Sequence, residues 1–203
     1  SCVVIVATIR ALKMHGGVEK ENLKKENLDA LKKGLPNLEK HINNVKKFGI
    51  ELVVAINHFI TDTDKEVSLI QDHCSRLGVK VSLCTHWSDG GKGTEDLAKN
   101  VVDACKKNNK ENFKYIYKDE ISILKKVETI AKEIYGASGI EFDDKVKEQV
   151  NIIEKSGFGK FPVCIAKTQY SFSTDPKLKG APSGHTLPIR EIRLSSGAGF
   201  VVV

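Results

Sequence analysis

The pattern that points most clearly to a fold is the β-branched run Val3-Val4-Ile5-Val6-Ala7-Thr8. Its apolar residues are continuous instead of alternating, which is typical of a parallel strand covered on both faces. Two similar runs follow at residues 52–56 and 79–84, and amphipathic stretches separate the three runs. The sequence therefore predicts an α/β fold in which a parallel sheet carries flanking helices.

Three helices are expected to accompany these strands. Apolar residues recur at steps of three and four from residue 20 to residue 48, with a break expected at Gly34-Leu35-Pro36. A second helix is expected over residues 63–77, with Thr63 as its N-cap and Gly78 as its end. The third is expected to run from Thr94 to about Lys107.

The pattern changes after Asn108-Asn109-Lys110, so we place a domain boundary near residue 110. Helices are expected at 121–135 and 143–155, strands at 161–166, 189–194 and 200–203, and an exposed loop at 175–188. These segments predict an α/β domain over residues 1–110 and a smaller α+β domain over residues 111–203. Both ends of the chain stop inside apolar, strand-like runs, so we expect a piece of a longer protein, truncated at its C-terminus.

Composition narrows the class of protein. The 203 residues are 40% hydrophobic and 29% charged, a mixture that excludes disordered, collagen-like and membrane-spanning chains. The net charge of +6 comes from lysines interspersed with acidic residues along helical stretches, which favours a solvated surface over a nucleic-acid-binding face. The expected partners are therefore small molecules, with neither nucleic acid nor a membrane among them.

The five cysteines are widely spaced and include no Cys-x-x-Cys pair, so the sequence indicates neither a disulfide framework nor a zinc site. Cys2, Cys84 and Cys164 lie in apolar runs, where a free cysteine is expected to act as a small core residue. This usage favours a reducing, intracellular compartment.

Ligands of parallel α/β sheets bind beyond the carboxyl ends of the strands. Three loops are expected to leave those ends, at residues 9–17, 57–63 and 85–94, and all three are rich in polar, aromatic and glycine residues. We therefore expect the functional site where these loops converge.

Two aromatic residues occupy similar places in neighbouring loops. Phe59 follows the second predicted strand, and Trp87, the one tryptophan, follows the third. Their flat faces could hold an aromatic ligand between them, or they could simply cover the end of the sheet. The residues by themselves leave both interpretations open.

The third loop does not fit a phosphate-binding P-loop, which needs Gly, four residues and then Gly-Lys-Ser/Thr. His86 stands at the position of the leading glycine, and Gly93 replaces the hydroxyl residue. The segment Gly90-Gly91-Lys92-Gly93 is either an anion contact near the Thr94 helix start or a flexible turn.

Three other polar groups have two open interpretations. Thr61 and Asp62 contact a nucleotide or anion, or Asp62 stabilises the turn before the second helix. His15 is a general base or a surface residue. The segment Lys167-Thr168-Gln169-Tyr170-Ser171 binds an anionic group or begins the exposed loop.

Several blocks together resemble formate–tetrahydrofolate ligase, the enzyme family also called formyltetrahydrofolate synthetase and also found in C1-tetrahydrofolate synthase. The most specific blocks are Ala11-Leu12-Lys13-Met14-His15-Gly16-Gly17 and Ala166-Lys167-Thr168-Gln169-Tyr170-Ser171. Further blocks lie at 59–63, at 87 with 90–93, at 157–159 and at 197–200, in the family's order and spacing. The resemblance spans the whole chain and corresponds to roughly the C-terminal two-fifths of the family's length, without its last few dozen residues.

The resemblance implies an activity for the parent protein. The family forms 10-formyltetrahydrofolate from formate, tetrahydrofolate and ATP with Mg²⁺, through formyl phosphate. It also implies a P-loop NTPase-like sheet, with the P-loop itself upstream of these residues. Residues 1–110 then correspond to the C-terminal part of a nucleotide- and folate-binding domain. No catalytic residue is transferred to this chain, and no metal site is expected in it.

The resemblance further implies which residues bind folate. Phe59 and Trp87 match the aromatic pair that stacks on the folate rings, and Leu83 matches an apolar wall of that pocket. The family often has proline after the phenylalanine, whereas this chain has Ile60, which leaves the stacking intact and the loop shape open. The expected binding residues are thus Phe59, Ile60, Leu83 and Trp87.

Two alternatives to a ligase fragment accompany this interpretation. The chain would otherwise be a non-catalytic folate-binding or assembly module, or, less favoured, an unrelated GTPase-like switch. For the ligase we expect a homo-oligomeric full-length protein in the cytoplasm, with a mitochondrial location left open. We expect the isolated 203-residue chain to have no ligase activity, and ATP-dependent formation of formyltetrahydrofolate by it would contradict this.

Overall fold

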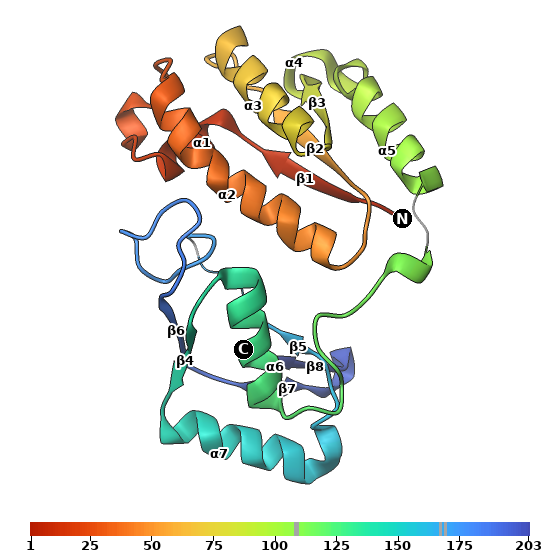
Figure 1. Cartoon of the computed structure of the whole chain (residues 1–203), viewed down its shortest axis with the longest axis vertical. Coiled ribbons are helices and arrows are strands. Elements are labelled where there is room, and N and C mark those ends of the chain that lie inside the picture. Colours follow the sequence, from red (N-terminus) through yellow and green to blue (C-terminus); the bar gives the residue numbers. More distant parts are fainter. Residues whose placement is uncertain (108–109, 167, 169) are drawn as a thin grey trace. The chain divides into compact units, whose positions relative to one another are not determined.

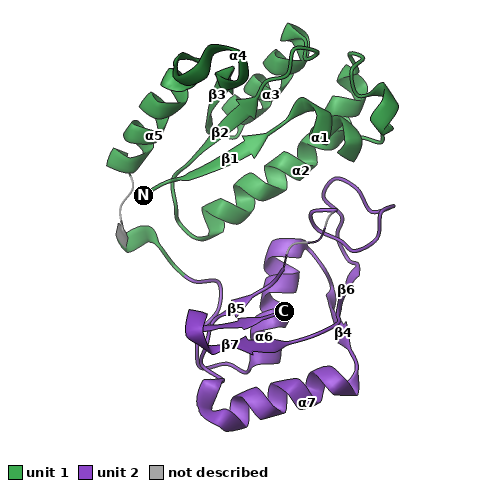
Figure 2. Ribbon diagram, turned by 180° about the vertical axis from the view of Figure 1, so that it is seen from behind, with its two compact units in different colours: residues 1–114 green, residues 115–203 purple. Residues whose placement is uncertain are grey.

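The computed structural model describes residues 1–107, 110–166, 168 and 170–203. The chain divides into two compact units, residues 1–114 and residues 115–203, which Figure 2 colours separately. Residues 108 and 109 of the predicted boundary region lie outside the described residues. The assignment of each unit as a functional domain stays a prediction.

The first unit is built on a three-stranded parallel sheet (Figure 1). Its strands are β1 (Val3–Ala7), β2 (Leu52–Asn57) and β3 (Lys80–Cys84), in the order β1-β2-β3. The register pairs Ala7 with Ile56 and Asn57 with Cys84, so all three strands end at one edge of the sheet. The predicted α/β fold with a parallel sheet is confirmed.

Helices cover the two faces of this sheet. The longer helices are α1 (Ile9–His15), α2 (Leu28–Lys47), α3 (Asp64–Arg76) and α5 (Glu95–Lys107). Side chains of α1, α2 and α3 form one core with the strands, and this core includes Ile56 and the half-buried Val81. On the opposite face, Asn100 of α5 donates a hydrogen bond of 2.9 Å to Ser82, whose side chain alternates with that of Val81 along β3. The short helices are η1 (Lys20–Asn22), α4 (His86–Asp89), η2 (Gly90–Thr94) and η3 (Lys110–Asn112).

The expected loop at residues 9–17 is wrong, because most of it forms helix α1. Thr8 caps this helix, since its side chain accepts a hydrogen bond of 3.1 Å from the N–H of Ala11. Ile9, Leu12 and Lys13 point inward and are buried. Strand β1 therefore passes into a helix through a single capping residue.

The expected break at Gly34-Leu35-Pro36 is also wrong, because α2 continues through all three residues. Gly34 is required by packing: a Cβ atom there would lie 1.9 Å from the carbonyl oxygen of Leu12 in α1. The glycine thus permits close contact between two helices. Tertiary packing keeps the helix continuous despite the lost N–H of Pro36.

Strand β1 was expected to be covered on both faces, but only one of its faces is covered by the described residues. Val3 and Ile5 pack against the core, while Val4 is 38% and Val6 64% exposed among the described residues. Helix α5 covers the corresponding face of β2 and β3 instead. The continuous apolar run is therefore buried on one side only in this chain.

The second unit has an α+β architecture with small sheets. Its helices are α6 (Ile123–Ile130), continued by the π-helical turn η4 (Ala131–Tyr135), and α7 (Asp144–Ile153), continued by η5 (Glu154–Phe158). Strands β4 (Gly139–Phe142) and β6 (Thr186–Ile189) pair in parallel. Strand β8 (Phe200–Val202) lies between parallel β5 (Val163–Cys164) and antiparallel β7 (Arg193–Ser195), and η6 (Ser196–Ala198) connects β7 to β8.

The two helices of this unit match the sequence-based prediction, whereas the strands differ in extent. The strand expected at 161–166 is limited to Val163–Cys164, and the one expected at 189–194 divides between β6 and β7. Strand β4 forms where only a helix connection was expected. No helix among the described residues is long and apolar enough to cross a membrane.

The predicted core role of cysteine holds for Cys84 and fails for Cys164. Cys84 is buried and Cys2 is half-buried, whereas Cys164 is exposed, because successive side chains of a strand point to opposite faces and its neighbour Val163 occupies the buried one. Cys74 of α3 is buried, and burial raises its pKa to about 11. The thiol of Cys74 therefore packs as a small apolar group.

Candidate functional site

The two aromatic residues follow adjacent strands at the carboxyl edge of the sheet. Phe59 comes two residues after Asn57 and Trp87 three residues after Cys84, and Asn57 and Cys84 are paired in the register. The N–H of His58 donates to the carbonyl of Cys84 at 3.1 Å, which extends the pairing toward Phe59. Trp87 lies on α4 and is 76% exposed, whereas Phe59 is half-buried.

The loop that carries Phe59 is closed by its own residues. Asp62 Oδ2 accepts a hydrogen bond of 2.9 Å from the N–H of Phe59, and the carbonyl of Phe59 accepts one of 2.8 Å from the N–H of Asp62. Burial raises the pKa of Asp62 above its ordinary value, while the hydrogen bond from Phe59 opposes the shift. The carboxylate of Asp62 thus has a defined role within the turn, which is one of the two interpretations left open by the sequence.

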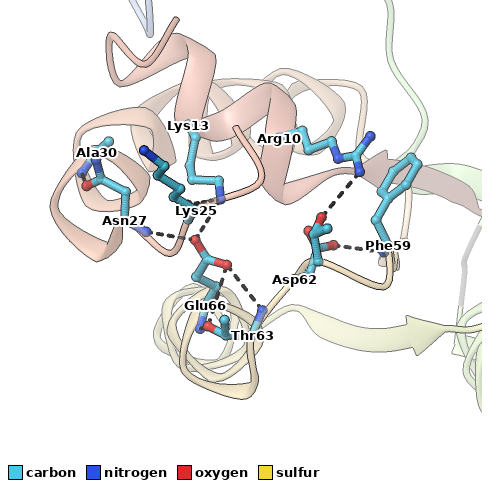
Figure 3. A network of polar contacts seen from close by, with 10 residues as sticks. Arg10, Lys13, Lys25, Asn27, Ala30, Phe59, Asp62, Thr63 and Glu66 are labelled. Carbon is cyan, nitrogen blue, oxygen red and sulfur yellow. Dashed lines mark hydrogen bonds and ion pairs between the residues drawn. The ribbon is translucent and has the colours of Figure 1, made fainter. Parts of the chain in front are cut away.

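Helix α1 contacts this loop through Arg10 (Figure 3). The guanidinium carbon lies 4.1 Å from the centre of the Phe59 ring, a cation–π geometry. Nη2 of the same group donates to Thr61 Oγ1 at 3.2 Å. One face of the Phe59 ring is therefore occupied by the protein itself.

A buried ion pair supports the same region one turn further along α1. Lys13 Nζ lies 2.9 Å from Glu66 Oε1 at the start of α3, and both side chains are 0% exposed. Lys13 also donates to the carbonyl of Lys25, and Glu66 accepts from the N–H groups of Asn27 and Thr63. Figure 3 shows these bonds linking α1, the segment before α2 and the start of α3.

The ionisation of Glu66 follows from these contacts. Burial acts to raise the pKa of Glu66, but the hydrogen bonds from Lys13, Asn27 and Thr63 outweigh it and lower the pKa below its ordinary value. Glu66 also forms a capping box with Thr63, the predicted N-cap of α3. The pair therefore fixes the position where the Phe59 loop enters α3.

The other expected folate residues border the same edge. Leu83, next to Ile56 in the register, is 36% exposed at the penultimate position of β3. Ile60 is 86% exposed at the tip of its loop. An apolar side chain at each position is thus accessible from solvent.

The expected anion segment, Gly90–Gly93, forms most of η2 and leads into α5. Gly90 has φ +58°, a left-handed value that favours glycine. A Cβ atom on Gly93 would lie 2.5 Å from the carbonyl carbon of Thr85, and the carbonyl of Gly93 accepts a hydrogen bond from the N–H of Thr85. Gly90 is therefore explained by its backbone conformation and Gly93 by close backbone packing.

The remaining candidates are His15 and the segment 167–171. His15 ends α1 and is half-buried. Lys167 and Gln169 lie outside the described residues. In the part of the chain that the structure describes, no group of three or more His, Cys, Asp or Glu side chains is arranged to hold a metal ion.

A cavity of about 710 Å³ lies in the second unit. Its wall includes the end of the chain, Val202 and Val203, together with Arg190, Arg193 and Thr168. It contains none of the residues expected to bind folate.

Sequence reasoning missed Arg10, Lys13 and Glu66. The Thr-x-x-Glu spacing at 63–66 was a usable signal for Glu66 as part of a capping box. No local signal identifies its partner Lys13, which lies 53 positions away. Arg10 was hidden for the same reason, because its contacts with Phe59 and Thr61 require α1 to lie against the next loop.

Known proteins resemble this chain along its whole length. The formate–tetrahydrofolate ligase family matches residues 1–203. The relatives named formate–tetrahydrofolate ligase include those of Pelagibacter ubique (61% identical over 203 residues), Hyphomonas neptunium (56% over 200 residues) and Sinorhizobium medicae (54% over 200 residues). The alignments cover 100%, 98% and 98% of this chain but 36%, 36% and 35% of those relatives, so the chain spans about a third of their length. The chain belongs to the formate–tetrahydrofolate ligase family.

Proposed function

We propose that this chain supplies the folate-stacking side of the active site of a formate–tetrahydrofolate ligase. The longer protein would use ATP to activate formate as formyl phosphate and would transfer the formyl group to tetrahydrofolate. Phe59 and Trp87 would bind the folate rings, with Leu83 and Ile60 as apolar borders.

One observation carries this proposal: Phe59 and Trp87 leave paired strands at the same sheet edge, and neither is buried in the core. Aromatic rings that served only to cover the end of the sheet would be expected to bury most of their own surface against it. Trp87 is instead 76% exposed. A flat ligand that stacks on these rings would bury apolar area that the protein leaves open.

The proposed reaction requires this chain to orient the folate amine relative to formyl phosphate. An amine of tetrahydrofolate attacks the carbonyl carbon of formyl phosphate, the bond from that carbon to the phosphate oxygen breaks, and the amine loses a proton as phosphate leaves. Holding the folate rings fixes the amine at the distance and angle that this attack needs. This orientation can lower the activation free energy by several kcal/mol. The residues named here would bind and orient, and none would exchange a proton.

ATP, Mg²⁺ and formate are assigned to the longer protein. We assign no Mg²⁺ ligand to this chain. Contact of Gly90–Gly93, Thr61 or Asp62 with an anionic group stays a prediction, as do the homo-oligomeric state and the cytoplasmic location. The isolated chain is expected to lack ligase activity.

Steady-state kinetics of the full-length ligase test the proposal. Phe59→Ala and Trp87→Ala should each raise the KM for tetrahydrofolate by about tenfold, because each removes one stacking surface, and leave the KM for ATP and formate unchanged. Tyr115→Ala removes another exposed aromatic side chain and serves as the matched control. Unchanged tetrahydrofolate kinetics in both variants would exclude the stacking role.

A further inference from the structure

We infer that Arg10 is a positioning residue for folate binding, which it supports by fixing the Phe59 ring from its protein-facing side. This inference rests on the proposed function of Phe59. Arg10 itself is assigned no contact with the ligand.

The first argument is the position of the guanidinium group. Its central carbon lies 4.1 Å from the centre of the Phe59 ring, well within the range of about 6 Å for a cation–π contact. A planar ring has two faces, and Arg10 occupies one of them. A ligand that stacks on Phe59 must therefore use the other face, and a layered arrangement of guanidinium, phenyl ring and folate ring would result.

The second argument is how Arg10 is held. Its Nη2 donates to Thr61 Oγ1 at 3.2 Å, two residues beyond the ring it covers. Its Nε is buried and has no hydrogen-bond partner among the described residues. A guanidinium placed only for hydrogen bonding would be expected to satisfy that donor. The ring contact therefore accounts better for its orientation than hydrogen bonding does.

The third argument is the rigidity of the surrounding elements. Asp62 closes the loop by accepting from the N–H of Phe59 at 2.9 Å. One turn along α1, Lys13 binds Glu66 at 2.9 Å, and Glu66 accepts from the N–H of Thr63. Helix α1 thus contacts both ends of the 59–66 segment, through Arg10 at Phe59 and Thr61 and through Lys13 at Glu66. Figure 3 shows both contacts on the same side of α1.

A ring held in this way is ordered before the ligand arrives. Binding then avoids part of the loss of side-chain freedom that an unsupported phenylalanine would undergo. Loss of Arg10 should therefore weaken folate binding even though the ring remains.

The test is a double-mutant cycle in the full-length ligase, with the dissociation constant for tetrahydrofolate as the readout. Arg10→Gln should raise this constant by about tenfold, with the KM for ATP and formate unchanged. Arg10→Lys should recover part of the affinity, because it retains the cation and loses the planar group. Arg76→Gln makes the same charge change at an exposed site and should leave the affinity unaltered.

The cycle with Phe59→Leu separates the inference from the function on which it rests. If Arg10 acts through the ring, Arg10→Gln should have no further effect in the Phe59→Leu background. Additive effects would mean that Arg10 acts independently of Phe59 and would overturn the inference. If Phe59→Leu weakens binding and Arg10→Gln does not, the inference fails and the stacking function stands. If Phe59→Leu has no effect, the stacking function itself fails.

Thr61→Val provides a second variant in case Arg10→Gln does not fold. It preserves the side-chain shape and removes the oxygen that holds the guanidinium. We expect a rise of about twofold in the dissociation constant, and no rise in the Phe59→Leu background. Equal affinity of Thr61→Val and the unmodified ligase would count against the inference.

Discussion

Lys13 Nζ and Glu66 Oε1 lie 2.9 Å apart, and both side chains are completely shielded from solvent. The bond joins the helix that follows β1 to the helix that follows β2. Glu66 also accepts from the backbone of Asn27, so three segments that are distant in sequence meet at one carboxylate. The loop that carries Phe59 ends at this point.

Removal of either partner should strongly destabilise the first unit. A buried charge left without its partner typically costs about 3–5 kcal/mol, so Lys13→Met and Glu66→Leu should each lower the free energy of unfolding by about that amount. In the double variant, the decrease in the free energy of unfolding should be smaller than the sum of the two single decreases. Urea unfolding of the 203-residue chain measures these values.

An exposed pair nearby provides the control. Lys65 lies 3.9 Å from Glu26, with 74% and 38% of the two side chains exposed. Lys65→Ala should change the free energy of unfolding by less than about 1 kcal/mol. If Lys65→Ala and Lys13→Met lowered the free energy of unfolding equally, burial of the Lys13–Glu66 pair would not increase its contribution to stability.

The same carboxylate should make stability depend on pH. The pKa of Glu66 in the folded protein lies below its ordinary value of 4.5, so the unfolded chain takes up the proton first as the pH falls. Its stabilising contribution is therefore fully present above pH 4.5 and is lost as the pH falls through the folded-state pKa. The difference in unfolding free energy between the unmodified chain and Glu66→Gln should shrink over that acidic range.

Asp62 should act in the opposite sense. Burial raises its pKa above the ordinary value of 3.8, so its contribution to stability is present at low pH and is lost as the pH rises through the folded-state pKa. Relative to the unmodified chain, Asp62→Asn should gain stability as the pH rises over that range. Parallel pH profiles for Glu66→Gln and Asp62→Asn would contradict both assignments.

The cysteines should differ in reactivity toward thiol reagents. Burial raises the pKa of Cys74 to about 11, so it carries little thiolate at neutral pH, and Cys84 is also buried. Cys105 and Cys164 are exposed. Mass spectrometry of the 203-residue chain after brief labelling should find Cys105 and Cys164 modified and Cys74 and Cys84 protected. Rapid labelling of Cys74 in the folded chain would be inconsistent with its place in the core.

The close approach of α1 and α2 should make Gly34 intolerant of substitution. A Cβ atom there would lie 1.9 Å from the Leu12 carbonyl oxygen, so Gly34→Ala should destabilise the chain by about 1–3 kcal/mol, although alanine favours helices. Gly91 has nothing within 4 Å of an added Cβ, and Gly91→Ala should change stability by less than about 0.5 kcal/mol. The two midpoints of thermal unfolding would distinguish these outcomes, and equal midpoints would contradict the packing argument.

The sheet could be predicted from the sequence because its strands form continuous apolar runs. The run at 52–56 is buried on both faces, as its pattern indicates, and α3 has both a clear cap at Thr63 and a clear periodicity. Helix α1 could not be recognised in the same way, since it is short and its inward face includes the charged Lys13. The expected break in α2 failed because Gly34 serves contact between helices, which local sequence does not reveal.

In the candidate site, too, some features could be predicted from local sequence and others depend on tertiary packing. The positions of Phe59 and Trp87 after adjacent strands follow from the rule that parallel strands end at one edge. The contacts of Arg10 and Lys13 depend on how α1 lies against the next loop, and that arrangement is a tertiary property. The sequence therefore indicated which residues face the edge and did not indicate which ones hold them.

The most direct measurement is the fluorescence of Trp87 during titration of the full-length ligase with tetrahydrofolate, compared with the Trp87→Phe variant. Stacking of a folate ring on the exposed indole predicts a saturable change that tetrahydrofolate produces and that ATP and formate do not. This change should disappear in Trp87→Phe and should require about tenfold more ligand in Phe59→Leu. Identical titration curves for the unmodified ligase and Trp87→Phe would contradict the proposed folate-stacking role of this chain.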